Sequence, residues 1–423
     1  MELLDLSRSA IGNGGATAIS INGIWRYLKV LSLEFNNISE EGAKALLHMK
    51  LKIEKIYLVC NKLREDFIKF LEEKRNFIVK VSIDLQELLK GNPQQKVVKL
   101  DSKEVKDMDV MLIGNTNWPN LEELHLGSNY VENKGAIVLG NNTFWRNLKT
   151  LNLINNRIRM EGAIAIGSNV TWVNLEELML DKNYLGDKGA AAIGSNTVWR
   201  KLKKLGLSNN SIEDKGTISI ALNLVWTNLE VLDLSNNQIG DEGGVAIGEN
   251  SSWSKLKRLS LSVNNMGNKA AESIGANKTW IHLEELLLQD NQIGDSGTEV
   301  IAKNRVWIDL KILDLSNNNI GNEGAIAIGS NSTWEKLEEL NLANNQIGDE
   351  GGAAIGGNSE WKKLKQLSLK GNIIGDEGAK AIGANKSWKN LKVLLLQYNY
   401  IGQTAAAALK KNETWQKGVR IEI

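Results

Sequence analysis

Leucine and asparagine recur along this chain at fixed intervals, and the interval defines a unit of 27 residues. Twelve of the thirteen tryptophans, from Trp118 to Trp415, follow one another at that spacing, and only Trp25 lies outside the series. When each unit is numbered from its Trp as position 1, positions 4, 7 and 9 are Leu in all eleven complete units. Positions 12 and 25 are Asn in the same units. Self-similarity at a fixed period is the sequence signature of a repeat protein.

Each unit contains one segment with the alternation of a β-strand. The leucines at positions 7 and 9 flank a variable residue, so the two leucines face a core and position 8 faces outward. The chain is then expected to turn at the Asn of position 12. Its side-chain amide can satisfy the backbone groups of a neighbouring coil, which a buried loop requires.

The second half of each unit has the features of a short helix. Position 15 is usually Gly and position 16 is Asp or Asn, as in Gly240 and Asp241. Because Asp and Asn are favoured N-cap residues, we expect position 16 to cap the helix of its own unit. Small residues at positions 18, 19, 21 and 23 allow close packing against neighbours. The Asn of position 25 is expected to end the helix in the left-handed conformation.

Stacking of the units predicts the architecture, because one unit alone cannot bury its apolar face. We expect a curved α/β solenoid of about fifteen strands, with a parallel concave sheet and short convex helices. The repeating indoles are expected to form a structural spine inside it, not a ligand cage.

The regularity of the units divides the chain into three stretches. Residues 1–74 contain further, less regular units, one of which begins at Trp25. Residues 75–117 match poorly and are interpreted as irregular or shortened repeats, with an inserted functional element as the alternative. Residues 118–423 form the regular array, and its last six residues are expected to be a final edge strand. The chain begins inside a unit, so either a longer protein precedes it or something covers that end.

Composition limits the classes of partner and compartment. The formal net charge of +1 argues against general nucleic-acid binding, which needs a basic surface. Cys60 is the only cysteine, so no internal disulfide can form, and a buried structural thiol is expected. Neither a cleavable leader nor a run of about eighteen apolar residues is present. A soluble protein without membrane contact is therefore expected, either cytoplasmic or delivered into a host cell by a route without a signal peptide.

No catalytic group of residues is apparent. His48, His125 and His282 are far apart in the sequence. Acidic turns such as residues 375–378 lack the alternating oxygen ligands of a calcium loop. The sequence therefore predicts neither an enzyme nor a cofactor or metal site.

Two patterns concern the outward side of the predicted strands. Position 5 alternates between Glu and Lys for ten coils, from Glu122 to Lys365, which predicts opposite charges side by side on neighbouring strands. In the last coils, apolar and aromatic residues gather near a lysine, as is typical of an interface. These candidate partner-binding residues are Lys370, Ile373, Val393, Leu395, Tyr398 and Tyr400. The alternative, that the two tyrosines only shield the end of the stack, stays open.

The motif L-x-x-L-x-L-x-x-N-x-I-G, followed by D-E-G-A-x-A-I-G, resembles the ribonuclease-inhibitor-like class of leucine-rich repeats over nearly the whole chain. Its G-A-x-A part is similar to the GALA-type repeats of some bacterial effectors. The resemblance implies a leucine-rich-repeat horseshoe that binds a protein partner through its concave face, with a bacterial effector as one such role. It also leaves open a ligand-sensing domain of a larger immune-sensor-like protein, or a GTPase-activating protein. The chain departs from these relatives in having a single Cys and no recognisable F-box.

Overall fold

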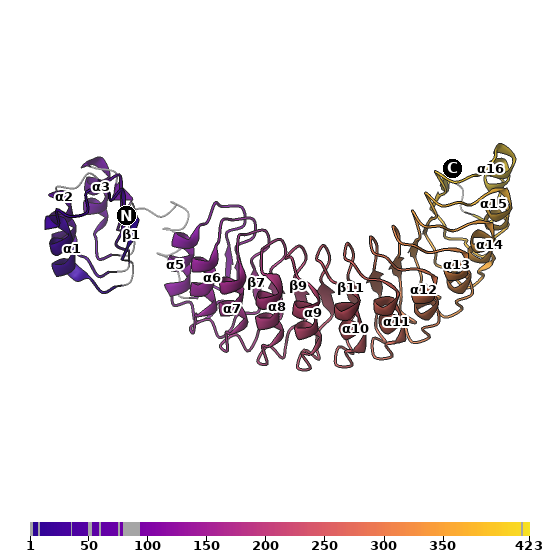
Figure 1. Cartoon of the computed structure of the whole chain (residues 1–423), viewed down its shortest axis with the longest axis horizontal. Coiled ribbons are helices and arrows are strands. Elements are labelled where there is room, and N and C mark those ends of the chain that lie inside the picture. Colours follow the sequence, from indigo (N-terminus) through magenta and orange to yellow (C-terminus); the bar gives the residue numbers. More distant parts are fainter. Residues whose placement is uncertain are drawn as a thin grey trace. The chain divides into compact units, whose positions relative to one another are not determined.

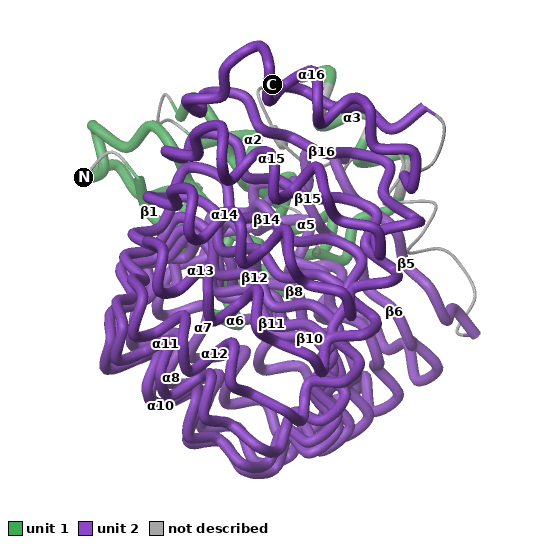
Figure 2. Tube along the Cα trace, turned by 90° about the vertical axis from the view of Figure 1, so that its right-hand side faces the viewer, with its two compact units in different colours: residues 1–92 green, residues 93–423 purple. Residues whose placement is uncertain are grey.

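The chain divides into two compact units, residues 1–92 and 93–423, which are coloured separately in Figure 2. The computed structural model describes residues 3–6, 9–34, 36–49, 53–58, 61–74, 77–78, 94–415 and 418–423. Cys60, expected to be a buried thiol, lies outside the described residues. Each unit is described on its own below.

The first unit is a stack of short strands and helices around a small apolar core. Its strands form one parallel sheet in sequence order. Leu31, Ile56 and Leu46 are among its buried residues. The elements are β1 (Leu3–Asp5), α1 (Gly12–Ile21), β2 (Val30–Ser32), α2 (Glu40–Leu47), β3 (Lys55–Tyr57), α3 (Glu65–Lys74) and β4 (Phe77–Ile78).

The second unit is an arc in which a parallel sheet lines the inner side and helices cover the outer side (Figure 1). Its strands are β5 (Val97–Lys99), β6 (Glu123–His125), β7 (Thr150–Asn152), β8 (Glu177–Met179), β9 (Lys204–Gly206), β10 (Val231–Asp233), β11 (Arg258–Ser260), β12 (Glu285–Leu287), β13 (Ile312–Asp314), β14 (Glu339–Asn341), β15 (Gln366–Ser368), β16 (Val393–Leu395) and β17 (Arg420–Glu422). Its helices are α5 (Asp107–Asn115), α6 (Asn133–Gly140), α7 (Met160–Gly167), α8 (Gly186–Gly194), α9 (Asp214–Ala221), α10 (Asp241–Glu249), α11 (Asn268–Ala276), α12 (Asp295–Ala302), α13 (Asn322–Gly329), α14 (Asp349–Gly357), α15 (Asp376–Gly383) and α16 (Gln403–Leu409).

The parallel strands and outer helices confirm the predicted α/β solenoid, although the strands lie in two sheets instead of one. The described residues form one sheet of four strands and one of thirteen. β17 is the final edge strand, as predicted for the last residues. Within the stretch interpreted as irregular, β5 pairs with β6 at an offset of 26 residues, since Val97 lies opposite Glu123. Residues 79–93 lie outside the described part, so the three-way division of the chain stays a prediction.

The repeating leucines and tryptophans make one continuous core in the second unit. Leu232, Leu234 and Trp253 are all fully buried, and so are their counterparts in the other regular coils. Some neighbouring indole rings stack on one another. The ring centroids of Trp118 and Trp145, for example, are 6.4 Å apart. Because the indoles are buried, the predicted structural spine is confirmed and a ligand cage is excluded for them.

The asparagine of position 12 connects each coil to the one before it. The Nδ2 of Asn237 donates to the carbonyl oxygen of Leu234 at 2.9 Å and to that of Leu207, one coil earlier, at 3.1 Å. Its Oδ1 accepts from the backbone N–H groups of Asn210 and Ile212, both at 3.0 Å. The predicted role of this amide, to satisfy a neighbouring coil, is therefore confirmed.

The asparagine of position 25 has a different backbone from the one predicted. Asn250 ends α10 in the extended conformation, with φ −64° and ψ 121°. Its Nδ2 donates to the carbonyl oxygen of Ala221 in the preceding coil, and its Oδ1 accepts from Ser252 N–H at 2.9 Å. The prediction of a left-handed backbone at position 25 was wrong. The backbone of Asn250 is extended, and its side chain turns inward and stabilises the loop through these hydrogen bonds.

The left-handed residue of each coil is at position 11 instead. Its φ lies between 53° and 67° in all eleven regular coils, from Ser128 to Tyr398. Asn, Ser, Asp or Gly fills it in most coils, and these residues tolerate the conformation well. Lys182, Val263 and Tyr398 are the three exceptions, and a residue of this kind costs about 1–2 kcal/mol in this conformation.

The acidic residue of position 16 also acts across coils and not within its own. The N-cap of α10 is Gly240, which has no side chain to cap with. Asp214, at the start of α9, accepts instead from the N–H groups of Gly240 and Gly243 at 2.7 and 2.9 Å. The prediction that position 16 caps its own helix was therefore wrong, because the side chain lies against the start of the next helix.

Small residues let the helices approach closely, as expected. A Cβ on Gly167 would lie only 2.5 Å from the carbonyl carbon of Ala192 in the next coil. The helices therefore pack so closely at Gly167 that a side chain there would require the neighbouring coil to shift.

We predict that replacing Trp253 with Ala lowers the free energy of unfolding by about 3–5 kcal/mol, the range for a large buried aromatic. Urea unfolding of the full chain measures the change. Trp253→Phe is the control: the indole N–H has no hydrogen-bond partner among the described residues, so the loss should be less than half as large. A loss below about 1 kcal/mol for Trp253→Ala would show that this indole is not part of the core.

Candidate functional site

The inner side of the arc is built from the outward residues of the strands. In β10, Leu232 is buried while Val231 and Asp233 on either side of it are half-buried. The same pattern recurs along the sheet, since residues two apart in a strand share a face. The residues of positions 6 and 8 therefore form a continuous concave face, and position 5 lies along its margin.

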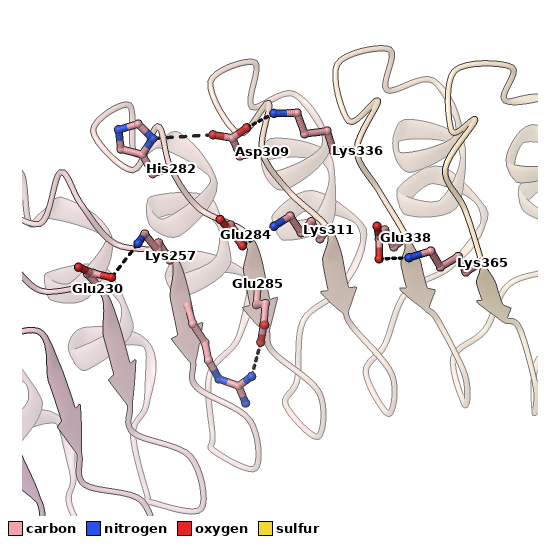
Figure 3. A network of polar contacts seen from close by, with 11 residues as sticks. Glu230, Lys257, His282, Glu284, Glu285, Asp309, Lys311, Lys336, Glu338 and Lys365 are labelled. Atoms are coloured by element: carbon pink, nitrogen blue, oxygen red, sulfur yellow. Dashed lines mark hydrogen bonds and ion pairs between the residues drawn. The ribbon is translucent and has the colours of Figure 1, made fainter. Parts of the chain in front are cut away.

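Ion pairs join neighbouring coils along position 5. In each pair a Lys contacts the Glu of the preceding coil, with the ammonium nitrogen 2.6–2.7 Å from a carboxylate oxygen. Figure 3 shows three of these pairs side by side on adjacent strands. The predicted opposite charges on neighbouring strands are confirmed. The pairs are Lys149–Glu122, Lys203–Glu176, Lys257–Glu230, Lys311–Glu284 and Lys365–Glu338.

These contacts shift the titration of the groups involved. The hydrogen bond from Lys149, together with one from Lys96, lowers the pKa of Glu122 to about 2. The hydrogen bond to Glu122 in turn raises the pKa of Lys149. The hydrogen bond from Lys257 likewise lowers the pKa of Glu230.

Other charges near the concave face are also paired. On position 6, Lys204 lies 2.7 Å from Glu177, and Arg258 contacts Glu285. On position 3, Asp309 contacts Lys336 and lies 3.7 Å from His282 (Figure 3). Because these charges are already paired within the chain, they offer a partner little additional electrostatic attraction.

Asp181 is an acidic residue of this face that the sequence did not single out. It is buried, with 7% of its surface exposed, and burial raises the pKa of its carboxyl group. One oxygen accepts from the N–H and the hydroxyl of Ser208, while the other has no partner among the described residues. The carboxylate lies over Gly206, where a Cβ would come within 2.2 Å of it. A side chain at position 206 would therefore force this carboxylate to shift.

The six candidate binding residues come together in two adjacent coils at the C-terminal end. Val393 and Leu395 lie on the same face of β16, half-buried, beside the edge strand β17. Lys370 stands over the ring of Tyr398, with its Nζ 5.3 Å from the ring centroid.

Three of the six candidates, Ile373, Tyr398 and Tyr400, have exposed side chains. Tyr398 is 78% exposed, Tyr400 75% and Ile373 53%. The N–H of Tyr400 donates to the carbonyl oxygen of Ile374, which places Tyr400 and Ile373 in equivalent loops of neighbouring coils. We name the six residues the C-terminal cluster: Lys370, Ile373, Val393, Leu395, Tyr398 and Tyr400.

A second group of aromatic and basic side chains was not predicted. Tyr130, Arg157 and Tyr184 occupy position 13 of three consecutive coils, and Arg159 lies two residues beyond Arg157. Each arginine stacks on one of the tyrosines. Its sequence signal is faint, because the members are 27 residues apart and become neighbours only when the coils are aligned.

His125 and His282 each lie near a carboxylate of the second unit. His125 lies 3.1 Å from Glu123, and His282 lies near Asp309. In the described ranges, no three His, Cys, Asp or Glu side chains gather in a way that could hold a metal ion. None of the helices in those ranges has the length and apolar content needed to span a bilayer.

Comparison with known proteins identifies the repeat. Nine segments match a family model described as Leucine Rich repeat: residues 26–47, 119–140, 146–167, 200–221, 227–248, 281–302, 309–329, 335–356 and 362–383. Leucine-rich repeats are thereby confirmed in both units. No curated protein sequence gives a significant match.

Two of the similar solved structures are of bacterial proteins. An internalin of Listeria monocytogenes is 19% identical, with 83% of this chain and 94% of that chain covered and a TM-score of 0.51. A leucine-rich-repeat protein of Leptospira interrogans is also 19% identical, with 99% and 95% covered and a TM-score of 0.48. At these identities the likeness concerns the fold alone.

We predict that the ion pairs of Glu122 with Lys96 and Lys149 contribute stability above pH 4.5 and lose it as the pH falls towards 2. The reason is that the pKa of Glu122 is lowered in the folded chain from its ordinary value of 4.5 to about 2, so folding favours the ionised form. The melting temperature of Glu122→Gln, compared with the wild type, should therefore be lower at pH 6 and converge with it at pH 2. Glu350→Gln, on the helical side, should match the wild type throughout. A difference for Glu122→Gln that does not shrink between pH 4.5 and 2 would contradict this assignment.

Proposed function

Because this chain is a solenoid of leucine-rich repeats, we propose that it is a scaffold that binds a protein partner through the concave face of residues 93–423. The C-terminal cluster is the proposed anchor of that interface. Repeat arcs of this kind offer an extended concave surface, which suits binding to a macromolecule better than binding to a small ligand.

The observation that carries the proposal is the exposure of large apolar groups in the C-terminal cluster. Tyr398, Tyr400 and Ile373 are each more than half exposed, so they add little to the core. Tyrosine loses few rotamers when it is buried by a partner, which makes it an effective anchor.

The backbone of Tyr398 supports the same conclusion. Its φ of 58° is the left-handed conformation that most other coils fill with a small or polar residue. A bulky, exposed side chain there costs stability and gains no burial in return. Its presence is therefore better explained by binding than by folding.

The rest of the concave face is proposed to orient the partner and to add less affinity. Its ion pairs already satisfy one another between coils, and charges that are paired in the free protein mainly set specificity and approach. Small polar residues such as Ser260 and Ser368 lie between them and are buried.

The finer assignments rest on the repeat type. We propose a non-enzymatic protein of the ribonuclease-inhibitor-like class, because each regular coil pairs one strand with one helix. The G-A-x-A element supports an effector-type protein with GALA-type units, acting in the cytoplasm or in a host cell. With paired charges and a net charge of +1, the partner is proposed to be a protein and not a nucleic acid.

We predict that replacing Leu395 and Tyr398 together with Ala weakens partner binding at least tenfold, or about 1.4 kcal/mol. The partner is first captured on the intact chain and identified, and its affinity for each variant is then measured by calorimetry. The melting temperature should change little, because neither side chain is fully buried.

The matched control is the double variant Glu350→Ala and Lys380→Ala on the helical side, which should bind like the wild type. If this control abolishes binding while the Leu395 and Tyr398 variant binds normally, the interface lies on the convex face and the proposal is wrong.

A further inference from the structure

The regular coils act as an internal reference that shows which residues the fold does not require. Position 13 holds an uncharged polar residue, Ser, Gln or Asn, in six consecutive coils, from Ser211 to Gln346. In the three coils before them the same position holds Tyr130, Arg157 and Tyr184. A coil folds with a small polar residue at this position, so the aromatic and basic residues need another explanation.

A second departure coincides with the first. Position 15 is Gly in the last seven regular coils, from Gly240 to Gly402, but is Arg159 in the coil that contains Arg157. Two guanidinium groups therefore project from one loop, between two coils that present tyrosines. We name this group the Tyr–Arg cluster: Tyr130, Arg157, Arg159 and Tyr184.

Stacking holds both guanidinium groups in place while leaving them accessible. Arg157 lies over the ring of Tyr130, with 4.8 Å between the guanidinium carbon and the ring centroid, and Arg159 lies 5.8 Å from the centroid of Tyr184. Tyr130 is 40% exposed and Tyr184 60%. A stacked guanidinium has less conformational freedom to lose when it binds, so its hydrogen bonds to a partner are less costly to form.

The cluster lines two adjoining surface pockets. One, of about 540 Å³, is bounded by both arginines, Tyr184 and Lys134. The other, of about 480 Å³, is bounded by Tyr130, Arg157 and Lys106. Asp107 and Glu132 contribute to both pockets. Each pocket is large enough to accept side chains from a partner.

The acidic residues nearby do not neutralise the two arginines. Asp107 uses its carboxylate to accept the backbone N–H of Glu132 at 2.7 Å, and burial raises its pKa. Glu132 lies 3.7 Å from Arg157, a long contact between two exposed side chains that contributes little. Within the described ranges, no carboxylate lies within ion-pair distance of Arg159.

We propose that the Tyr–Arg cluster binds an acidic segment of a protein, whose carboxylates accept hydrogen bonds from Arg157 and Arg159. The planar guanidinium matches a carboxylate with two parallel hydrogen bonds. Tyrosine and arginine are also the residues most enriched at the energetic centres of interfaces.

Discrete carboxylates fit this surface better than a nucleic-acid backbone does. Glu104, Asp107 and Glu132 line the same pockets, so the surface lacks the continuous basic stripe that a nucleic-acid backbone requires. The inference rests on the proposed function only in that the partner is a protein. The surface itself lies along the loops of position 13, away from the C-terminal cluster.

The test uses a fluorescein-labelled hexaglutamate peptide and the full chain at low ionic strength, with binding followed by fluorescence anisotropy. The wild type should bind, and the double variant Arg157→Ala and Arg159→Ala should bind at least about tenfold more weakly. The matched control is Arg200→Ala with Arg305→Ala, which removes the same charge from two exposed arginines outside both pockets. It should bind like the wild type.

Three results would overturn the proposal. The wild type could fail to bind hexaglutamate, both double variants could lose affinity equally, or a hexathymidylate could bind more tightly than the peptide at the cluster. All four substituted arginines are exposed, so the melting temperatures of both variants should match that of the wild type. The Leu395→Ala and Tyr398→Ala variant should retain hexaglutamate binding, which separates failure of this site from failure of the concave interface.

Discussion

The structure of the regular array depends on hydrogen bonds that cross from one coil to the next. Each coil has a loop whose backbone is buried, and a buried N–H or carbonyl group without a partner is costly. The amide of Asn237 satisfies such groups in two coils at once. Asp214 and Asn250 make equivalent bonds to their own neighbouring coils, at the start of a helix and at its end. No regular coil is therefore complete without its neighbour, which accounts for the strict 27-residue period.

This arrangement separates the residues that build the coil from those that are free to vary. Leu, Trp and Asn fill the interior and the loops, and their identity hardly changes from coil to coil. The outward residues of the strands and the side chains at positions 11 and 13 are not needed to fill the interior. Most residues of the two proposed binding surfaces occupy these positions, and Lys370 at position 10 and Arg159 at position 15 extend them. The C-terminal cluster and the Tyr–Arg cluster are thus departures from a pattern that the fold itself supplies.

Periodicity allowed the strands, the indole spine and the position 5 ion pairs to be predicted from the sequence. Periodicity could not show which coil a side chain contacts, because nearly the same residue types recur every 27 positions. The sequence pattern is the same whether Asp214 caps its own helix or the next one. Only the structure shows that it caps the next helix. The left-handed residue was misplaced for a related reason, since Asn at position 25 and Asn at position 11 are equally compatible with it. The C-terminal cluster was visible because four of its residues, from Val393 to Tyr400, lie within one strand and the loop that follows it, whereas Tyr130, Arg157 and Tyr184 are each separated by a whole unit.

The most direct test of this account is the loss of stability caused by Asn237→Ala, measured by equilibrium urea unfolding of the full chain. Removal of the amide leaves backbone groups in two coils buried without partners, so the loss should be about 3–5 kcal/mol. Asn265→Ala, at position 13 of the next coil, should change stability by less than about 0.5 kcal/mol, because its exposed side chain makes no hydrogen bond among the described residues. A loss for Asn237→Ala no larger than that for Asn265→Ala would contradict the claim that hydrogen bonds between coils hold the solenoid together.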